Sequence, residues 1–242
     1  MLPVTRYDIE ADEAETDLWL VPTEPGEARR LTTGTATGGR PAWSPDGKHI
    51  AFVAKRGDDE QNQLWVLPAD GGEARRLTEV PTGVNTPKWL PDSSGLVFVS
   101  RVWTDLEGWE AQGERMEERT DRKMTAYVWD RPPIRWWAHW IDDRAAHLFR
   151  VDLDGGEPEA ITLDTGLRLS ERNLGSAGPG PEGFDISPEG DELAFVADSD
   201  PTGTDTNFDV YLIPLTGGDA INITADNPAS DNTPLYSPDG RW

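Results

Sequence analysis

The sequence predicts an all-β fold, a partial β-propeller built from four-stranded blades. Two phrases return along the 242-residue chain. One is a turn followed by an apolar strand, in "WSPDGKHIAF" (43–52), "WLPDSSGLVF" (89–98), "ISPEGDELAF" (186–195) and "YSPDGRW" (236–242). The other is "LWLVPTEPGEARRLT" (18–32), "LWVLPADGGEARRLT" (64–78), "LFRVDLDGGEPEAIT" (148–162) and "VYLIPLTGGDAINIT" (210–224). Repeats of about 40–50 residues with several short strands are typical of propeller blades, whereas the repeats of a β-helix are far shorter.

Each unit is expected to contain four short strands. In the turn phrase, Pro45 restricts φ, Asp46 tolerates a tight bend and Gly47 supplies positive φ. "HIAFVA" is then predicted to be a buried strand, and "LWVL" the next one, which the turn "ADGGEA" joins to "RRLT". A fourth strand is expected to end near "RPAW" or "TPKW". The aromatic residues that recur in both phrases, Trp65 and Trp43 among them, are expected to pack between neighbouring sheets.

The repeats divide the chain into complete, interrupted and partial units. Because both ends fall inside a repeat, the chain is expected to be a segment of a longer polypeptide. The complete units are 41–78 and 184–224, the interrupted unit is 87–162 with an insertion at 104–146, and the partial units are about 7–32 and 233–242.

The composition excludes several kinds of partner and site. A net charge of −23 and a pI near 4.3 argue against nucleic acid and anionic membrane surfaces, which both require a basic face. The absence of cysteine excludes a disulfide scaffold, a thiolate metal site and a cysteine nucleophile. The chain starts without the apolar segment of a secretory signal, which leaves the bacterial cytoplasm and the periplasm both open.

The insertion carries the least repetitive part of the sequence. Its first half, "TDLEGWEAQGERMEERTDRKM" (104–124), is charged and lacks β-branched runs, which predicts a helix or a mobile arm. A group of aromatic residues beside acidic ones is a candidate binding surface, and within it we assign Trp136 and Trp137 to substrate binding. Six of the eleven tryptophans lie in this region, at positions 103, 109, 129, 136, 137 and 140.

Two longer stretches resemble a known family. They are "AYVWDRPPIRWWAHWIDDRAAHLFRVDLDGGEP" (126–158) and "TNFDVYLIPLTGGDAINITADNPASDNTPLYSPDGRW" (206–242). With the repeats, they resemble the propeller of the prolyl oligopeptidase family of serine peptidases, in the branch of bacterial dipeptidyl-peptidases and acylaminoacyl-peptidases. The general repeat is also similar to that of TolB-type propellers.

In that family the propeller precedes an α/β-hydrolase domain with a Ser-Asp-His triad. This chain contains no Gly-x-Ser-x-Gly, so no catalytic residue is assigned, and the chain alone is expected to be inactive. His49, His139 and His147 are expected to be structural. The resemblance implies a propeller that gates and positions short peptides for its own C-terminal hydrolase domain, which is absent from this chain. The alternative is a free-standing TolB-like propeller that acts as a protein-binding scaffold.

The resemblance also implies one substrate-binding pair. In the dipeptidyl-peptidase members, adjacent glutamates from a propeller insertion bind the free amino terminus of the substrate. Glu117 and Glu118 are the adjacent pair of this insertion, and two carboxylates suit an ammonium group; a solvated helix face is the alternative. The Asp-rich stretch 198–209 has carboxylates that suit calcium, but such a hairpin loop needs no ion, so no metal or cofactor is expected.

Overall fold

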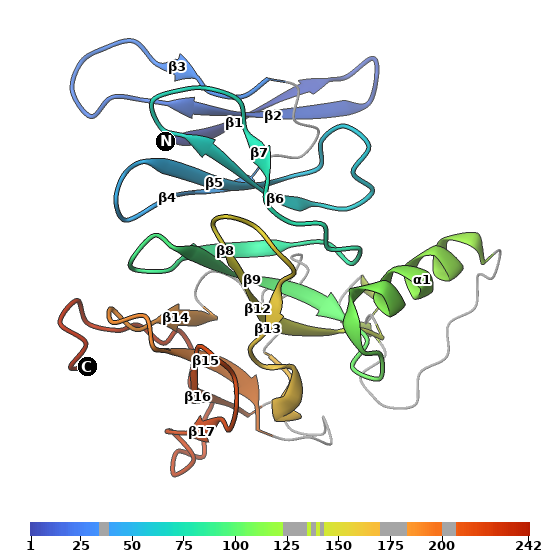
Figure 1. Cartoon of the computed structure of the whole chain (residues 1–242), viewed down its shortest axis with the longest axis vertical. Coiled ribbons are helices and arrows are strands. Elements are labelled where there is room, and N and C mark those ends of the chain that lie inside the picture. The colour runs from blue at the N-terminus through green and yellow to red at the C-terminus, as the bar shows by residue number, and fades with distance from the viewer. Residues whose placement is uncertain (34–38, 123–134, 137–138, 141–142, 170–182, 200–206) are drawn as a thin grey trace. The chain divides into compact units, whose positions relative to one another are not determined.

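The repeated phrases form antiparallel sheets that follow one another along the chain (Figure 1). The second sheet has the order β4-β5-β6-β7 and the last has the order β14-β15-β16-β17. The structure, a computed structural model, describes residues 1–33, 39–122, 135–136, 139–140, 143–169, 183–199 and 207–242. The strands of these two sheets are β4 (Gly39–Trp43), β5 (His49–Ala54), β6 (Gln63–Pro68), β7 (Arg75–Arg76), β14 (Phe184–Ile186), β15 (Glu192–Asp198), β16 (Phe208–Pro214) and β17 (Ile221–Asn222).

The remaining elements include a third four-stranded sheet, of order β13-β12-β9-β8, and a three-stranded sheet at the start of the chain. The predicted all-β fold with four-stranded blades is therefore confirmed. The strands are β1 (Leu2–Asp8), β2 (Glu13–Leu20), β3 (Arg29–Arg30), β8 (Asn85–Trp89), β9 (Gly95–Val102), β12 (Ala145–Asp152) and β13 (Glu159–Ala160). The described residues also form a two-stranded antiparallel sheet of β10 (Arg135–Trp136) and β11 (His139–Trp140), the helix α1 (Gly108–Asp121) and a 3-10 turn (Leu163–Thr165).

The segments "RPAW" and "TPKW" form the first strands of their sheets in chain order, whereas the sequence predicted that a fourth strand ends near them. In the second sheet, β4 pairs antiparallel with β5, so that Trp43 lies opposite Ile50. The reason is the turn between them, which is short enough to make the two strands a hairpin. The amide of Ser44 donates to the carbonyl of His49 at 2.9 Å and closes it.

One hydrogen-bonding pattern recurs in the turns. The amide of Gly47, at φ 71°, donates to the carbonyl of Ser44, and the amide of His49 donates to the Ser44 hydroxyl, both at 2.9 Å. Ser187 accepts the corresponding bonds in the last sheet. The Ser44 hydroxyl and the backbone amide of Lys48 hold the pKa of Asp46 at about 2. The polar side chains of this repeated phrase therefore stabilise the turn itself.

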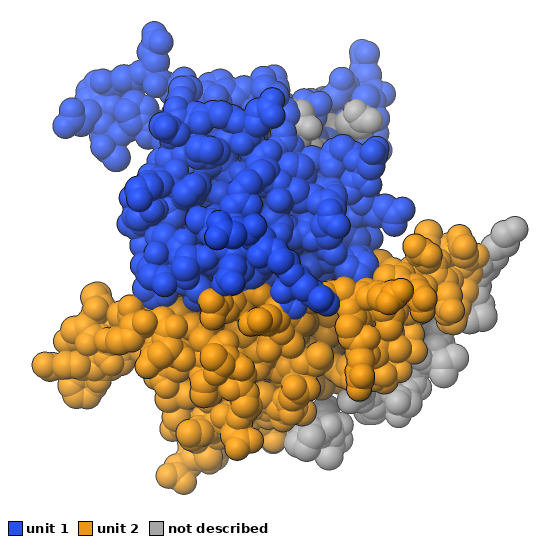
Figure 2. Space-filling view, in the orientation of Figure 1, with its two compact units in different colours: residues 1–98, 151–158 blue, residues 99–150, 159–242 orange. Residues whose placement is uncertain are grey.

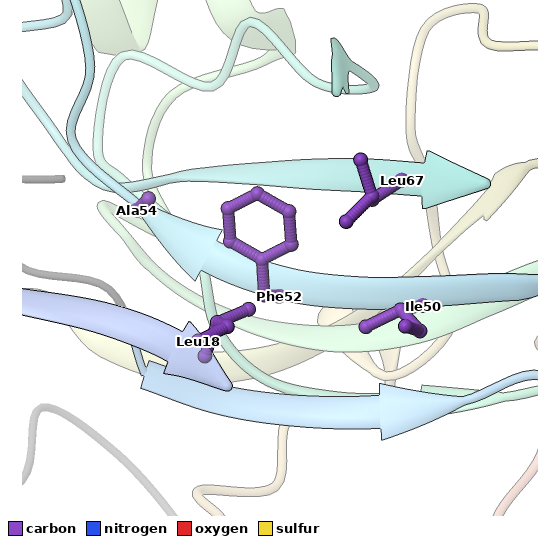
Figure 3. Close-up of a cluster of buried hydrophobic side chains, with 5 residues drawn as sticks. All are labelled: Leu18, Ile50, Phe52, Ala54 and Leu67. Carbon is purple, nitrogen blue, oxygen red and sulfur yellow. The ribbon is translucent and has the colours of Figure 1, made fainter. Parts of the chain in front are cut away.

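The chain forms two compact units, which are 1–98 with 151–158, and 99–150 with 159–242 (Figure 2). In the first unit, Leu18 of β2 packs against Phe52 and its neighbours on β5 and β6 (Figure 3). Burial of such side chains stabilises the fold by about 1.5–3 kcal/mol each. In the second unit, a smaller cluster is formed by Ala194, Val196 and Val210.

The expectation that the recurring aromatics pack between sheets is wrong for Trp43. Its side chain is 41% exposed because it ends β4 beside the exposed turn residues Pro45 and Asp46. Trp89, at the corresponding position, is 8% exposed, and its Nε1 donates to the carbonyl of Ala42 at 3.0 Å.

Gly39 and Gly95, which begin β4 and β9, test how closely neighbouring strands approach each other. A Cβ at Gly95 would lie 2.5 Å from the carbonyl oxygen of Val151, whereas a Cβ at Gly39 would meet nothing within 4 Å. We expect Gly95→Ala to lower the free energy of unfolding by about 1–3 kcal/mol, because the backbone must move. Gly39→Ala should change it by less than about 0.5 kcal/mol. Urea unfolding followed by circular dichroism compares them, and equal midpoints would contradict the register of β9.

Candidate functional site

Helix α1 lies in the predicted insertion, between β9 and β12 in sequence. It begins at Gly108 and ends at Asp121, so the helical insertion expected from the sequence is confirmed. Its buried residue is Gln112, and its glutamates at 114, 117 and 118 are exposed. The helix therefore has one anchored side and one acidic, solvent-facing side.

Gln112 connects the helix to the end of β9 through the backbone of Trp103. Its Oε1 accepts from the amide of Trp103 at 3.0 Å, and its Nε2 donates to the carbonyl of Trp103 at 2.8 Å. The side chain is 3% exposed, so the oxygen and the nitrogen of its amide both find hydrogen-bond partners away from water. A second contact joins the rings of Trp109 and Phe149, whose centroids are 4.8 Å apart. These contacts restrict how the helix can turn about its axis.

The Trp103 indole is the centre of a charged cluster. The guanidinium groups of Arg115, Arg119 and Arg144 lie 5.5, 5.9 and 5.5 Å from its ring centroid, within the range of cation–π attraction. The indole Nε1 donates to Asp143 Oδ2 at 3.0 Å, and Arg119 donates to the other oxygen of the same carboxylate at 2.6 Å. Trp103 is 4% exposed, so this cluster fastens α1 while it keeps the ring from solvent.

The two candidate glutamates lie on the opposite, exposed side of α1. Glu118 forms an exposed ion pair with Arg122 at 3.6 Å, one helical turn away. Glu117 and Glu118 are therefore adjacent, solvent-accessible carboxylates on a fixed helix. Of the two tryptophans assigned to substrate binding, Trp136 lies in β10 and Trp137 lies outside the described residues.

Among the histidines, His147 is the most enclosed. It is 1% exposed, and its Nδ1 lies 3.2 Å from the hydroxyl of Thr162. Within the described residues its buried Nε2 makes no hydrogen bond. Burial lowers the pKa of His147 to about 4, and the positive charge of Arg168 acts in the same direction. A neutral imidazole with a structural partner fits the structural role that the sequence suggested.

His147 is one of four buried polar residues at equivalent places in the repeats, a recurrence that was not predicted from the sequence. Each lies in the last strand but one of its sheet in chain order. The next residue donates its amide to a threonine 14 positions away, as Leu148 does to Thr162 at 2.9 Å. The signal was present, because a polar residue precedes "LW", "LF" or "VY" in every unit. The four residues are Asp17, Gln63, His147 and Asp209, exposed by 1%, 5%, 1% and 3%, and their threonines are Thr32, Thr78, Thr162 and Thr224.

The described ranges hold neither a cluster of metal ligands nor a helix suited to a membrane. No three His, Asp or Glu side chains there come together as metal ligands, and residues 200–206 of the Asp-rich stretch lie outside those ranges. None of the described helices combines the length and the apolar character that a membrane crossing requires.

The repeats place the chain among known propellers. Residues 12–123 match the family described as the Tricorn protease N-terminal beta propeller domain. Over 99% of its length, the chain is 28% identical to dipeptidyl-peptidase 5 of Porphyromonas endodontalis. It spans 34% of that relative, or about a third of its length.

Solved structures agree on the fold. The acylaminoacyl peptidase of Pyrococcus horikoshii superimposes with a TM-score of 0.58 and 17% identity, over 91% of this chain and 30% of that one. A putative TolB from Agrobacterium tumefaciens gives a TM-score of 0.52 and 21% identity, over 98% and 66%. The resemblance predicted from the sequence is thus confirmed: the chain is a β-propeller segment with TolB-like repeats, similar to the propeller of the dipeptidyl- and acylaminoacyl-peptidases of the prolyl oligopeptidase family.

Proposed function

We propose that the chain is the non-catalytic propeller of a serine exopeptidase, which gates short peptides and positions their amino ends for a hydrolase domain. The observation that carries the proposal is the anchored helix α1, which interrupts a blade and presents two adjacent carboxylates to solvent. Similarity to a dipeptidyl-peptidase along 99% of the chain supports the same function.

The chemistry follows from the charges. A substrate ammonium group between Glu117 and Glu118 would donate charge-assisted hydrogen bonds, which are about twice as strong as neutral ones. The Glu118–Arg122 ion pair is 67% and 60% exposed, and pairs of this kind contribute little stability. An incoming ammonium group can therefore replace Arg122 at small cost. Gln112 and Trp103 keep the helix, and so the carboxylates, in place during this exchange.

The test uses the complete coding sequence that contains residues 1–242, assayed with dipeptidyl reporters. Loss of one charge-assisted hydrogen bond corresponds to about 1.5–3 kcal/mol. We therefore expect Glu117→Gln or Glu118→Gln to raise KM by about 10- to 100-fold for substrates with a free amine. N-acylated substrates should be unaffected, and kcat should change little.

Glu114→Gln is the matched control, because Glu114 is an exposed glutamate of the same helix outside the adjacent pair. Equal KM values for wild type and both pair variants would rule out the amine-binding role. Trp136→Ala and Trp137→Ala extend the test to the proposed aromatic contacts.

A free-standing protein-binding scaffold is the second candidate, and similarity to TolB structures favours it. The two functions differ in a simple observation. Hydrolysis of the dipeptidyl reporter by the complete gene product supports the peptidase, whereas an inactive product that captures a partner protein supports the scaffold. The 242-residue chain alone should be inactive in both cases.

A further inference from the structure

The second sheet is joined to the third sheet, of order β13-β12-β9-β8, by hydrogen bonds at four places in the repeat. Each of these bonds uses at least one side chain, and each connects residues of the sheets or of their turns. We call this contact the second joint. The bonds, from donor to acceptor, are Trp89 Nε1 to the Ala42 carbonyl at 3.0 Å, the Asp46 amide to the Ser93 hydroxyl at 3.1 Å, Arg40 to the Thr86 hydroxyl at 3.1 Å, and Arg75 to the Leu153 carbonyl.

Turn and strand register identify the equivalent positions one sheet later in the chain. The amide of Leu90 donates to the carbonyl of Gly95, and the amide of Ser187 donates to that of Glu192, so Leu90 and Ser187 are equivalent. In the same way, Val66 pairs with an arginine of β7 where Arg150 pairs with a glutamate of β13. The equivalent residues are therefore Trp89 and Ile186, Ser93 and Gly190, Thr86 and Gly183, and Arg75 and Glu159.

At each of the four places, the later residue lacks the group that makes the bond. The Ile186 side chain has no N–H, and Gly183 and Gly190 have no hydroxyl. An ionised Glu159 only accepts hydrogen bonds, so it cannot donate to a carbonyl as arginine does. We call the contact between the third and the last sheet the third joint. All four bonds of the second joint are therefore absent from it.

The contacts that come before and after these two joints carry side-chain hydrogen bonds as well. Between the first and the second sheet, Arg29 donates to the carbonyl of Ala69 at 3.3 Å, and it is the equivalent of the arginine at the second joint. Beyond the last sheet, Tyr236 donates from its amide to Asp185 and from its hydroxyl to Glu192, both at 3.0 Å. The loss of these fastenings is thus particular to the third joint.

The third joint keeps a backbone contact and a possible pivot. A Cβ at Gly217, in the turn after β16, would lie 3.4 Å from the carbonyl oxygen of Ile161, which follows β13. Leu169 forms an antiparallel bridge with Ala197 of β15. Gly166 lies between that bridge and the 3-10 turn, at φ 70°, and a Cβ there would meet nothing within 4 Å. A glycine in open space can absorb a change of backbone angles, as hinge residues do.

We propose that the chain opens at the third joint, where the last sheet separates from the third sheet while the second joint stays closed. A typical hydrogen bond changes an equilibrium constant by about 2- to 10-fold. Four absent bonds therefore favour opening at the third joint over opening at the second. In a peptidase, such an opening would give short peptides a lateral way in. The opening itself does not depend on the proposed function, because it needs no substrate.

Distances between pairs of nitroxide labels test the proposal in the product of the complete coding sequence. Residues 1–242 contain no cysteine, so labels can be attached to introduced cysteines once any cysteine elsewhere is changed to serine. Glu73→Cys with Asp154→Cys spans the second joint, and Glu157→Cys with Thr216→Cys spans the third. The two pairs are equivalent in the repeat, and all four positions are exposed. Double electron–electron resonance should show one narrow distance distribution at the second joint and an additional, longer distance at the third.

Two double variants exchange the fastenings between the joints. Glu159→Arg with Gly190→Ser restores two bonds at the third joint, and each restored bond should lower the ratio of open to closed molecules by about 2- to 10-fold. Serine suits position 190, because Gly190 has φ 74° where Ser93 has φ 65°. Arg75→Glu with Ser93→Gly removes the same bonds from the second joint, where the longer distance should then appear.

The circular dichroism spectrum of each variant checks folding. Glu159→Arg alone and Arg75→Glu alone replace a double variant that fails to fold, because both positions are exposed. A distribution at the third joint as narrow as that at the second would overturn the proposal. A longer distance that the folded Glu159→Arg variants leave unchanged would overturn it as well, since the opening would then not depend on the missing bonds.

Discussion

Replacing Trp103 with alanine is expected to lower the free energy of unfolding by about 3–5 kcal/mol and to release helix α1. The ring is 4% exposed and is surrounded by Arg115, Arg119 and Arg144, so its removal leaves a cavity lined by cations. Asp143 also loses the hydrogen bond that it accepts from the indole N–H at 3.0 Å. The glutamates of α1 would then be carried by a helix that is no longer fixed.

Two measurements separate the effects of this substitution. Urea unfolding gives the loss of stability, and hydrogen exchange of residues 108–121 reports the release of the helix. Trp103→Phe keeps an aromatic face for the guanidinium groups and loses only the N–H donor, so its cost should be smaller, about 1–3 kcal/mol. Trp242→Ala, at an 82% exposed tryptophan, should cost almost nothing. Unchanged exchange in Trp103→Ala would show that the cluster does not hold the helix.

His147 is expected to make the stability of the chain depend on pH. Burial lowers the pKa of His147 from its ordinary 6.5 to about 4 in the folded chain. Above pH 6.5 the imidazole is neutral in both states, and its full contribution is present. As the pH falls from 6.5 towards 4, the unfolded chain binds the proton first, so stability is lost. At 1.36 kcal/mol per pKa unit the loss reaches about 3 kcal/mol near pH 4, and about 2 kcal/mol at pH 5.

Gln63 indicates the variant that removes this dependence. It occupies the equivalent position of the second sheet, and its Oε1 accepts from Thr78 at 2.9 Å without a group that titrates. Urea unfolding gives the free energy of unfolding of wild type and His147→Gln at pH 7 and pH 5. Between these two pH values, the variant should lose about 2 kcal/mol less than the wild type. These conditions stay above the pI near 4.3. Gln63→His should introduce a loss of the same sign, and parallel pH profiles for all three chains would exclude His147 as its source.

The sheets were predictable because turn chemistry is local. Pro45 and Gly47 favour a tight turn through their own φ preferences. The two strands that such a turn connects pair antiparallel. The position of Trp43 was not predictable in this way. Trp43 and Trp89 occupy equivalent places in the repeat, yet they are 41% and 8% exposed, so the repeated phrase does not determine their burial.

The same limit applies to the candidate site. The charged composition of residues 104–124 indicated a helix, and the helix is present. The helix is attached through Gln112, which bonds to Trp103 nine residues earlier in the chain. Trp103 in turn bonds to Asp143, 40 residues later. No periodic pattern encodes such contacts, because each occurs once in the chain.

The four buried polar residues bear on how a repetitive chain avoids pairing the wrong strands. The segments 27–32 and 73–78 are both "EARRLT", and the sheets have nearly the same register. However, Asp17 is paired with Arg30 at 2.5 Å, while Ala160 occupies the position equivalent to Arg30 beside His147. Strand β2 paired with β13 would remove Arg30 and leave the buried Asp17 carboxylate with Arg6, whose side chain is 59% exposed, as its remaining cationic partner. Removing one partner of a buried ion pair is destabilising. We therefore expect Asp17 to penalise the exchange of strands between blades whose backbones are alike.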